Sequence, residues 1–483
     1  MGRRLDLWLP SYVLGAAGRR RARRARSDGL THVFFLICDH YEPRHKATRD
    51  GQAWERVETW RSEYPAFQRR CVDSFGQAPL HSWFYPPHHG SEHLPQLSAM
   101  AHAGGGEVEL HYHHRDDTAE SLTRDLKATL ALYNRHGLLL ESGHPPRTSF
   151  GFVHGDWTLD NACNGQYCGV NGELSLLGGL GCWADFTMPS ANEAQTRKIN
   201  SIYYAVDDPS RHKSHDRGVD AAVGRVHEPG FFLMQGPLGI NWRAPRYPRV
   251  ENASLTSVNW GRPDRVRTWL DCGVHVKGRP EWLFIKLHTH GAVERDFDAL
   301  FGEKAFQMHQ ALNELCNDGR KHQLHYVTAR QAYNLAKAAE RGLGGDPRQW
   351  MDLVVDRPAT AHYALGIEHD LGICTPTRLR IHNMASGPDA ALSTLVGALR
   401  EARGPLASID IDSVADAAQG SIAAELRAAG VLQLTFDRPI QLESDSTVGV
   451  LGPVDESGST WRIEARAPGL VRLRYRDRAA VPA

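Results

Sequence analysis

Histidines gather in one part of this sequence. The chain of 483 residues contains 26 histidines, and eight of them lie between His81 and His114. The predicted strand EVEL (107–110) is followed by His111, His113 and His114. Because side chains alternate along a strand, His111 and His113 share a face and lie about 7 Å apart. Two imidazoles on one face could bind a metal ion such as Zn²⁺, together with a carboxylate from a neighbouring strand.

Polar residues also end the first and a late apolar run of the chain, THVFFLIC (31–38) and EWLFIKL (281–287). In parallel α/β proteins, functional sites form at the carboxyl ends of the strands, so we expect these groups to meet in one polar site. They could bind a metal or act only as acid–base groups. The residues concerned are Asp39, His40 and Glu42 after the first run, and His288 and His290 after the late one.

Strand-like and helix-like segments alternate from residue 31 to about residue 340. Continuous apolar runs are typical of buried parallel strands, whereas 118–137 and 328–342 have helical patterns with capping residues and a terminal glycine. This alternation predicts a parallel α/β architecture and favours a barrel. The pattern changes near residue 345, where short alternating segments between turn residues predict an accessory β-rich domain, interrupted by a helix at 388–404. We therefore divide the chain into an N-terminal segment (1–28), a barrel (29–344) and a β-rich domain (345–483).

The composition excludes several classes of protein. Lys and Arg together number 56, as do Asp and Glu, and this zero net charge argues against a nucleic-acid partner. The eight cysteines include no Cys-x-x-Cys pair, which argues against a zinc ribbon or a thioredoxin motif. No apolar run reaches 18 residues, so we expect no membrane-spanning helix.

The first 26 residues carry eight arginines and one aspartate, with an apolar stretch (5–18) before a basic one (19–26). This order is not that of a secretory signal, and we expect a cytoplasmic protein. Two interpretations of the segment remain open. It could make a peripheral contact with anionic lipid of the inner membrane or with a membrane-bound partner. Alternatively, it is a helix packed on the domain and followed by a solvated basic linker.

The order of these motifs resembles the polysaccharide deacetylase family, with its NodB-homology or carbohydrate esterase family 4 fold. In that family a first strand ends in two acidic residues, a second strand carries two metal-binding histidines, and a late strand ends in a histidine that acts as general acid. The resemblance covers about residues 31–340 and implies a distorted (β/α)7 barrel. The phrases DHYEP, YCGVNGEL, DFTMPS and INSIYY also resemble uncharacterised members encoded with bacterial surface-polysaccharide genes.

The resemblance implies roles for individual residues. Asp39 takes the place of the catalytic base and His288 that of the general acid, although a related pattern would give the acidic roles to Asp39 and Glu42. The second histidine ligand is His113 or His114, because the family's spacing falls here on Arg115. The implied metal ligands are His40, His111, His113 and His114. The candidate contacts to substrate are His154, Asp156, Trp157, Asp185 and His290.

These inferences predict a metal-dependent hydrolase that removes N-acetyl or other N-acyl groups from a sugar, polysaccharide or glycan intermediate. Zn²⁺ is the expected cofactor, since imidazole-rich ligation suits it. One alternative is a glycoside hydrolase on a similar barrel, which would need two opposed carboxylates. Another is a degenerate barrel that binds glycans or scaffolds a complex, because Asp39-His40 replaces the family's acidic pair. Metal analysis discriminates between them, since a degenerate barrel should purify without stoichiometric metal.

Overall fold

The computed structural model describes residues 4–26, 29–136, 138–142, 147–190, 192–225 and 229–356, Pro358, and strands between 378 and 477 with residues 454 and 459. The chain forms two compact units, and each is described by itself. The first comprises Met1–His93, Gly104–Ala128 and Ser149–Asp356, and the second comprises Leu94–Ala103, Thr129–Thr148 and Arg357–Ala483. The domain limits inferred from the sequence stay a prediction.

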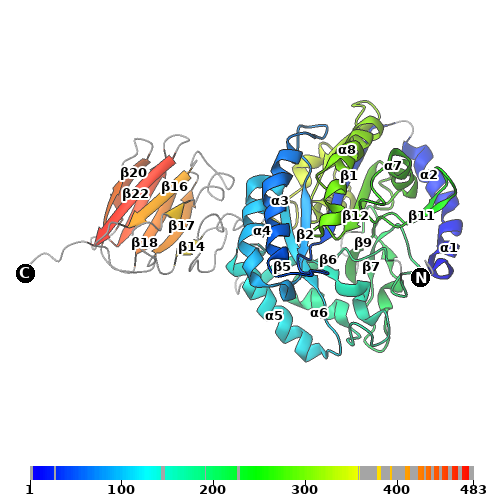
Figure 1. Ribbon diagram of the computed structural model, residues 1–483, viewed down its shortest axis with the longest axis horizontal. Coiled ribbons are helices and arrows are strands. Elements are labelled where there is room, and N and C mark those ends of the chain that lie inside the picture. Colours follow the sequence, from blue (N-terminus) through cyan, green and yellow to red (C-terminus); the bar gives the residue numbers. More distant parts are fainter. Residues whose placement is uncertain are drawn as a thin grey trace, which may run out of the picture. The chain divides into compact units, whose positions relative to one another are not determined.

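A mostly parallel sheet crosses the first unit (Figure 1). β7 pairs antiparallel with its neighbours β8 and β9, and β13 (His322–Tyr326) pairs with the first half of β1. The α/β fold predicted from the alternating pattern is therefore confirmed. Among the described strands, no pairing closes this sheet into a barrel. In spatial order the strands are β12 (Trp282–Thr289), β1 (Thr31–His40), β2 (His81–Tyr85), β3 (Gly106–Tyr112), β5 (Arg147–His154), β6 (Cys182–Asp185), β9 (Phe231–Met234), β7 (Ile202–Ala205) and β8 (Val219–Asp220).

Helices alternate with these strands along the chain. The predicted helix at 328–342 is confirmed as α9, whose first turn is closed by a reciprocal capping box between Thr328 and Gln331. The predicted helix at 118–137 is confirmed as α5. The helices are α3 (Gln52–Gln68), α4 (Leu94–Met100), α5 (Ala119–Arg135), α6 (Glu173–Leu180), α7 (Pro263–Cys272), α8 (Glu303–Cys316) and α9 (Ala329–Glu340), and a small hairpin pairs β10 (Gly239–Asn241) with β11 (Arg249–Glu251).

The sheet register brings the carboxyl ends of four strands together. All residues of β1 from Val33 to His40 are buried, as expected for a central parallel strand covered on both faces. Asp39 of β1 lies opposite Thr289 of β12, and Tyr112 of β3 lies opposite His154 of β5. The polar residues that end these strands therefore lie at one edge of the sheet, as the sequence predicted.

The N-terminal residues form two short helices, α1 (Leu5–Leu14) and α2 (Ala16–Arg26). Trp8 of α1 is only 1% exposed, and Arg23 of α2 pairs with Asp271 of α7 at 2.5 Å. Figure 1 shows α2 beside α7. These contacts agree with a helix packed on the domain, while the lipid contact stays a prediction. No helix among the described residues is long and apolar enough to cross a membrane.

The described residues in the C-terminal part of the second unit form mainly strands, while the accessory β-rich domain stays a prediction. An antiparallel sheet has the order β14-β17-β18-β21-β20, and a second sheet has the order β15-β16-β22-β19. Of the helix predicted at 388–404, only Leu392–Ser393 is described, and these residues form β15. The strands are β14 (Arg378–Ile381), β15 (Leu392–Ser393), β16 (Ser408–Ser413), β17 (Ile422–Ala428), β18 (Val431–Phe436), β19 (Ile440–Ser444), β20 (Gly449–Pro453), β21 (Thr460–Ala465) and β22 (Leu470–Asp477), and β4 (Leu140–Ser142) belongs to the same unit.

Candidate metal centre

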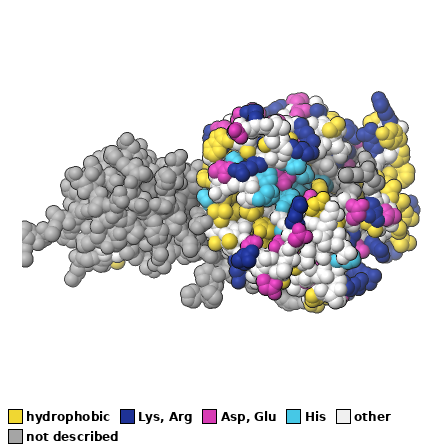
Figure 2. Space-filling model, turned by 60° about the horizontal axis from the view of Figure 1, so that its bottom comes forward, with side chains coloured by type: hydrophobic (Ala, Val, Ile, Leu, Met, Phe, Trp, Pro, Cys, Tyr) yellow, Lys and Arg dark blue, Asp and Glu magenta, His cyan; other side chains and the backbone are white. Residues whose placement is uncertain are grey.

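Glu42 lies at the middle of the histidine cluster. It follows β1 by two residues, and its side chain is only 5% exposed. Figure 2 shows histidine side chains gathered on one face of the first unit. Five imidazoles surround the carboxylate: Oε1 lies 2.9 Å from His113 Nε2, 3.7 Å from His111 Nε2 and 4.0 Å from His89 Nε2, while Oε2 lies 3.5 Å from His290 Nε2 and 3.7 Å from His45 Nδ1.

The rings of His111 and His113 are held so that their Nε2 atoms face Glu42. His111 Nδ1 lies 2.9 Å from the carbonyl oxygen of Val153, to which it donates. His113 Nδ1 lies 3.3 Å from Asp156 Oδ2. Such outer partners orient histidine ligands in metal sites. The two Nε2 atoms are 3.0 Å apart, a distance at which a proton or a cation must lie between them.

The donor set of Glu42, His111 and His113 fits a divalent metal. Their ligand atoms all lie within 4.8 Å of one another. Two histidines and one glutamate form a known catalytic zinc set, which leaves further positions for water and substrate. Glu42 also belongs to a second candidate group with His88 and His89, so further imidazoles are available on the same side.

The charges around Glu42 favour an ionised carboxylate. Burial acts to raise the pKa of Glu42, but hydrogen bonds with His111 and His113 hold it well below its usual range. Burial and the neighbouring His113 lower the pKa of His111. For His113, burial acts downward, but Asp156 and Glu42 raise its pKa to about 9. Without an ion, His113 therefore favours its protonated form, and a metal ion that binds its Nε2 would displace that proton.

His40 and His288 are buried beside the group formed by Glu42, His111 and His113. The His40 ring is 4.8 Å from that of His111 and 6.1 Å from that of His288, between ring centres. Among the described residues, neither His40 Nε2 nor His288 Nδ1 has a hydrogen-bond partner, although both atoms are buried. Burial lowers the pKa of both rings well below its usual value. The structure therefore places His40 beside the candidate ligands but outside the groups whose ligand atoms converge.

Asp39 is fully buried, and both of its oxygens have partners. Oδ1 accepts the backbone N–H of Gly291 at 2.6 Å, and Oδ2 lies 2.9 Å from His81 Nε2. Trp60 Nε1 donates to the carbonyl oxygen of Gly291 at 2.8 Å. Asp39 therefore fixes the loop that carries His290.

Replacing Asp39 with asparagine should weaken the fold. The amide cannot accept at both of its terminal atoms, so a buried donor loses its partner, which costs about 1–3 kcal/mol. We expect the free energy of unfolding in urea to fall by this amount, with unchanged metal content. If Asp39→Asn keeps full stability and loses all activity, Asp39 is the catalytic base that the motif resemblance implies.

The structure places the predicted substrate contacts other than His290 at three different locations. Asp156 is half-exposed beside His113, and the Trp157 ring lies 6.0 Å from that of His290, so both belong to the Glu42 centre. His154 and the predicted ligand His114 meet instead in a separate group. Asp185 is buried and accepts from Thr187 Oγ1 at 2.6 Å. Burial raises the pKa of Asp185 to about 6.

The sequence indicated Glu42 only as an alternative acidic residue and assigned no role to its neighbours His45, His88 and His89, although His111, His113 and His290 were candidates. Glu42 lies three positions after Asp39 and beyond the end of the strand. The alternation of side chains along a strand therefore does not predict where its carboxylate points. His88 and His89 follow two prolines after β2, where no helical or strand period applies. The sequence feature that could have indicated this site is a carboxylate shortly after one predicted strand combined with a His-His pair after the next strand.

No family model matches this chain, and no curated protein matches it. Two solved structures show distant likeness. A protein from Parabacteroides distasonis, provisionally assigned as a glycoside hydrolase/deacetylase, is 11% identical over 84% of this chain and 81% of its own, with a TM-score of 0.35. An alpha-mannosidase from Enterococcus faecalis V583 is 10% identical over 65% of this chain, with a TM-score of 0.32. The match spans only 30% of the mannosidase. These likenesses identify no family.

Proposed function

We propose that this chain is a metal-dependent hydrolase that removes N-acyl groups from a carbohydrate substrate. The observation that carries the proposal is the convergence of Glu42 Oε1 with the Nε2 atoms of His111 and His113. These three residues would hold the ion. The order of the strand-end motifs, which resembles that of polysaccharide deacetylases, supports the acyl-amide and carbohydrate parts of the proposal.

A divalent cation in this position supplies a Lewis acid, which polarises an acyl carbonyl and acidifies water. The protein's own groups position the ion and move protons. Asp156 orients His113 through Nδ1, and the Val153 carbonyl does the same for His111. Removal of such outer partners typically costs about 10–100-fold in metal affinity or activity.

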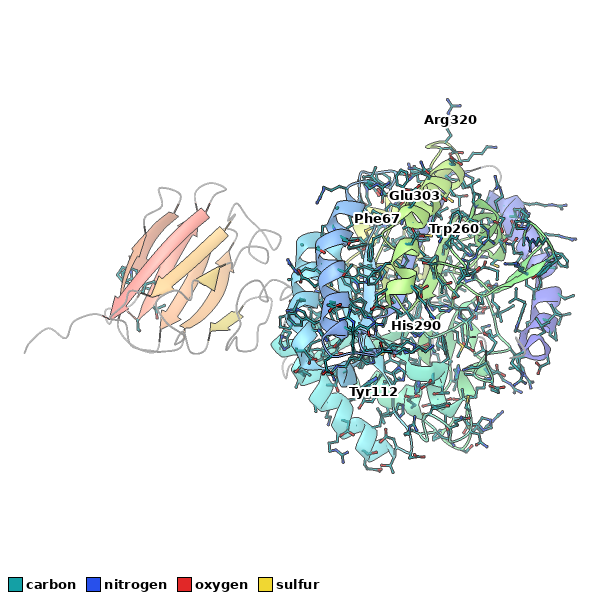
Figure 3. The ribbon with its side chains drawn as sticks, in the orientation of Figure 1. Phe67, Tyr112, Trp260, His290, Glu303 and Arg320 are labelled. Atoms are coloured by element: carbon teal, nitrogen blue, oxygen red, sulfur yellow. The ribbon has the colours of Figure 1, made fainter. Side chains whose placement is uncertain are left out.

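His290 is the better placed of the two late histidines to protonate a leaving amine. Its Nε2 lies 3.5 Å from Glu42 Oε2, and its side chain is 25% exposed, whereas His288 is buried. His290, which is labelled in Figure 3, directly follows β12. A proton donor must come within hydrogen-bond reach of the leaving amine, and the partial exposure of His290 leaves it open to a substrate. The Trp157 ring beside it offers a flat apolar face to a sugar.

Metal removal tests the proposal. Acetate release from a panel of N-acetylated sugars and oligosaccharides should disappear after treatment with a chelator and return on addition of Zn²⁺. The variant His212→Ala, which lacks an exposed histidine away from the centre, should behave like the wild type. Activity that survives complete metal removal would contradict the proposal. A protein without activity and without bound metal would instead support the glycan-binding or scaffold alternative.

A further inference from the structure

A second group of ligand-type side chains lies beside the Glu42 centre and takes no part in it. His114 follows β3, His154 ends β5, Cys168 lies in the loop between β5 and α6, and Glu173 is the first residue of α6. All four are almost completely buried, with side-chain exposures of at most 3% for His114, His154 and Glu173. Cys168 is 0% exposed. Burial of so many polar groups needs a physical explanation.

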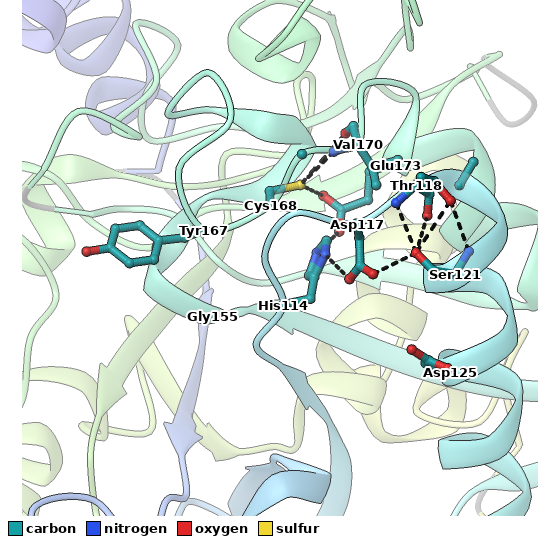
Figure 4. A network of polar contacts seen from close by, with 12 residues as sticks. His114, Asp117, Thr118, Ser121, Asp125, Gly155, Tyr167, Cys168, Val170 and Glu173 are labelled. Atoms are coloured by element: carbon teal, nitrogen blue, oxygen red, sulfur yellow. Dashed lines mark hydrogen bonds and ion pairs between the residues drawn. The ribbon is translucent and has the colours of Figure 1, made fainter.

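The four ligand atoms converge on one point, within 4.8 Å of one another. Figure 4 shows His114, Cys168 and Glu173 turned toward each other. His114 Nε2 lies 2.9 Å from His154 Nε2 and 3.1 Å from Glu173 Oε1, His154 Nε2 lies 3.4 Å from Glu173 Oε1, and Cys168 Sγ lies 3.8 Å from Glu173 Oε2.

The Nδ1 atoms of His114 and His154, on the other side of each ring, already have hydrogen-bond partners. His114 Nδ1 lies 3.0 Å from Asp117 Oδ2, and His154 Nδ1 lies 2.5 Å from the carbonyl oxygen of Gly155. A carboxylate and a carbonyl only accept, so each Nδ1 carries its proton. A neutral ring protonated at Nδ1 has a bare lone pair at Nε2. Two such lone pairs face each other at 2.9 Å and would repel, unless a proton or a cation lies between them.

The other two ligands, Glu173 and Cys168, are also fixed by hydrogen bonds from backbone groups. Glu173 Oε2 accepts the backbone N–H of Asp160 at 2.6 Å, which leaves Oε1 toward the imidazoles. Cys168 Sγ accepts the N–H of Val170 at 3.4 Å. Asp117 is itself fixed by Ser121 Oγ, which donates to Oδ1 at 2.7 Å (Figure 4). A ligand set with such supporting partners is typical of a metal site.

We propose that His114, His154, Cys168 and Glu173 form a second, buried metal site, and that its ion is a structural Zn²⁺. Two nitrogens, one sulfur and one oxygen fill the four positions of a tetrahedral zinc ion, which leaves none open for substrate. The ion would connect the ends of β3 and β5 to the start of α6. The neighbours in sequence, His113 and Asp156, belong to the Glu42 centre, so this site would also stabilise that centre.

A proton shared between the two imidazoles is the competing explanation of the cluster, and cobalt spectroscopy distinguishes the two. Metal-free protein, prepared with a chelator, is titrated with Co²⁺. Cobalt bound to a thiolate has an intense sulfur-to-metal charge-transfer band in the near ultraviolet, which nitrogen and oxygen ligands do not give. Because the Glu42 centre contains no cysteine, this band reports only the second site.

We expect the band in the wild type and in Glu42→Gln, and its loss in Cys168→Ser. The matched control Cys163→Ser removes a nearby cysteine outside the group and should keep the band. By elemental analysis, Cys168→Ser should contain one equivalent of zinc fewer than Cys163→Ser. Circular dichroism of each variant shows whether it has folded.

The site does not depend on the proposed hydrolase activity. Absence of the band from wild-type protein whose Glu42-dependent activity is intact would overturn the second site alone. Wild-type protein that takes up Co²⁺ with no charge-transfer band would contradict the proposal without any variant. Equal zinc content in folded Cys168→Ser and Cys163→Ser would contradict it as well, and would favour the shared proton.

Discussion

Replacing Glu42 with glutamine should abolish the hydrolase activity and remove the catalytic metal. The amide keeps the size of the side chain but loses the negative charge that neutralises a divalent cation among several imidazoles. Loss of an outer partner of a metal ligand costs roughly 10–100-fold. Since Glu42 would be a direct ligand, we expect a larger fall in kcat/KM. Acetate release and elemental analysis of the purified variant measure the two effects.

The control for this prediction is Glu58→Gln, which makes the same chemical change on the surface. Glu58 lies on α3 with a half-exposed side chain, and its ion-pair partner among the described residues is Arg61. Its variant should keep both metal and activity. If Glu42→Gln keeps wild-type activity and metal content, Glu42 is not a ligand, and the account of the centre is wrong.

His290→Ala should lower kcat by about 10²–10⁴, the usual contribution of a positioned acid or base. Its metal content should stay unchanged, because the proposed ligands are Glu42, His111 and His113. His288→Ala should have a smaller effect on kcat and a larger one on stability, since it opens a cavity in a buried part of the site. Steady-state kinetics, elemental analysis and thermal unfolding of the two variants provide the comparison.

The reverse result would assign the acid to the other histidine. If His288→Ala is folded, retains its metal and loses activity, while His290→Ala stays active, then His288 protonates the leaving group. That is the role that the motif resemblance implies. The buried Nδ1 of His288 would then have to become accessible when substrate binds.

The sequence predicted the parallel strands and the edge where the site lies, because both follow from local pattern. Apolar runs such as 31–38 predict buried strands. Because the strands are parallel, the polar residues at their carboxyl ends lie at the same edge of the sheet. The convergence of His111 with His113 followed from the same alternation.

The roles after the strand ends could not be predicted in this way. Past the last paired residue, the chain direction depends on tertiary contacts rather than on a period. Thus His113 turns toward Glu42 while the adjacent His114 turns toward Glu173. The motif resemblance implies that Asp39 is the base, but its partners His81 and Gly291 are far away in sequence. No local pattern contains such contacts.

The central claim is that a metal ion binds between Glu42, His111 and His113. A crystal structure of the zinc-loaded protein, with anomalous data collected on both sides of the zinc absorption edge, tests this most directly. We predict an anomalous peak within bonding distance of Glu42 Oε1 and of both Nε2 atoms. Zinc-loaded crystals with no anomalous peak at Glu42, or with a peak held by Asp39 and His40 instead, would contradict it.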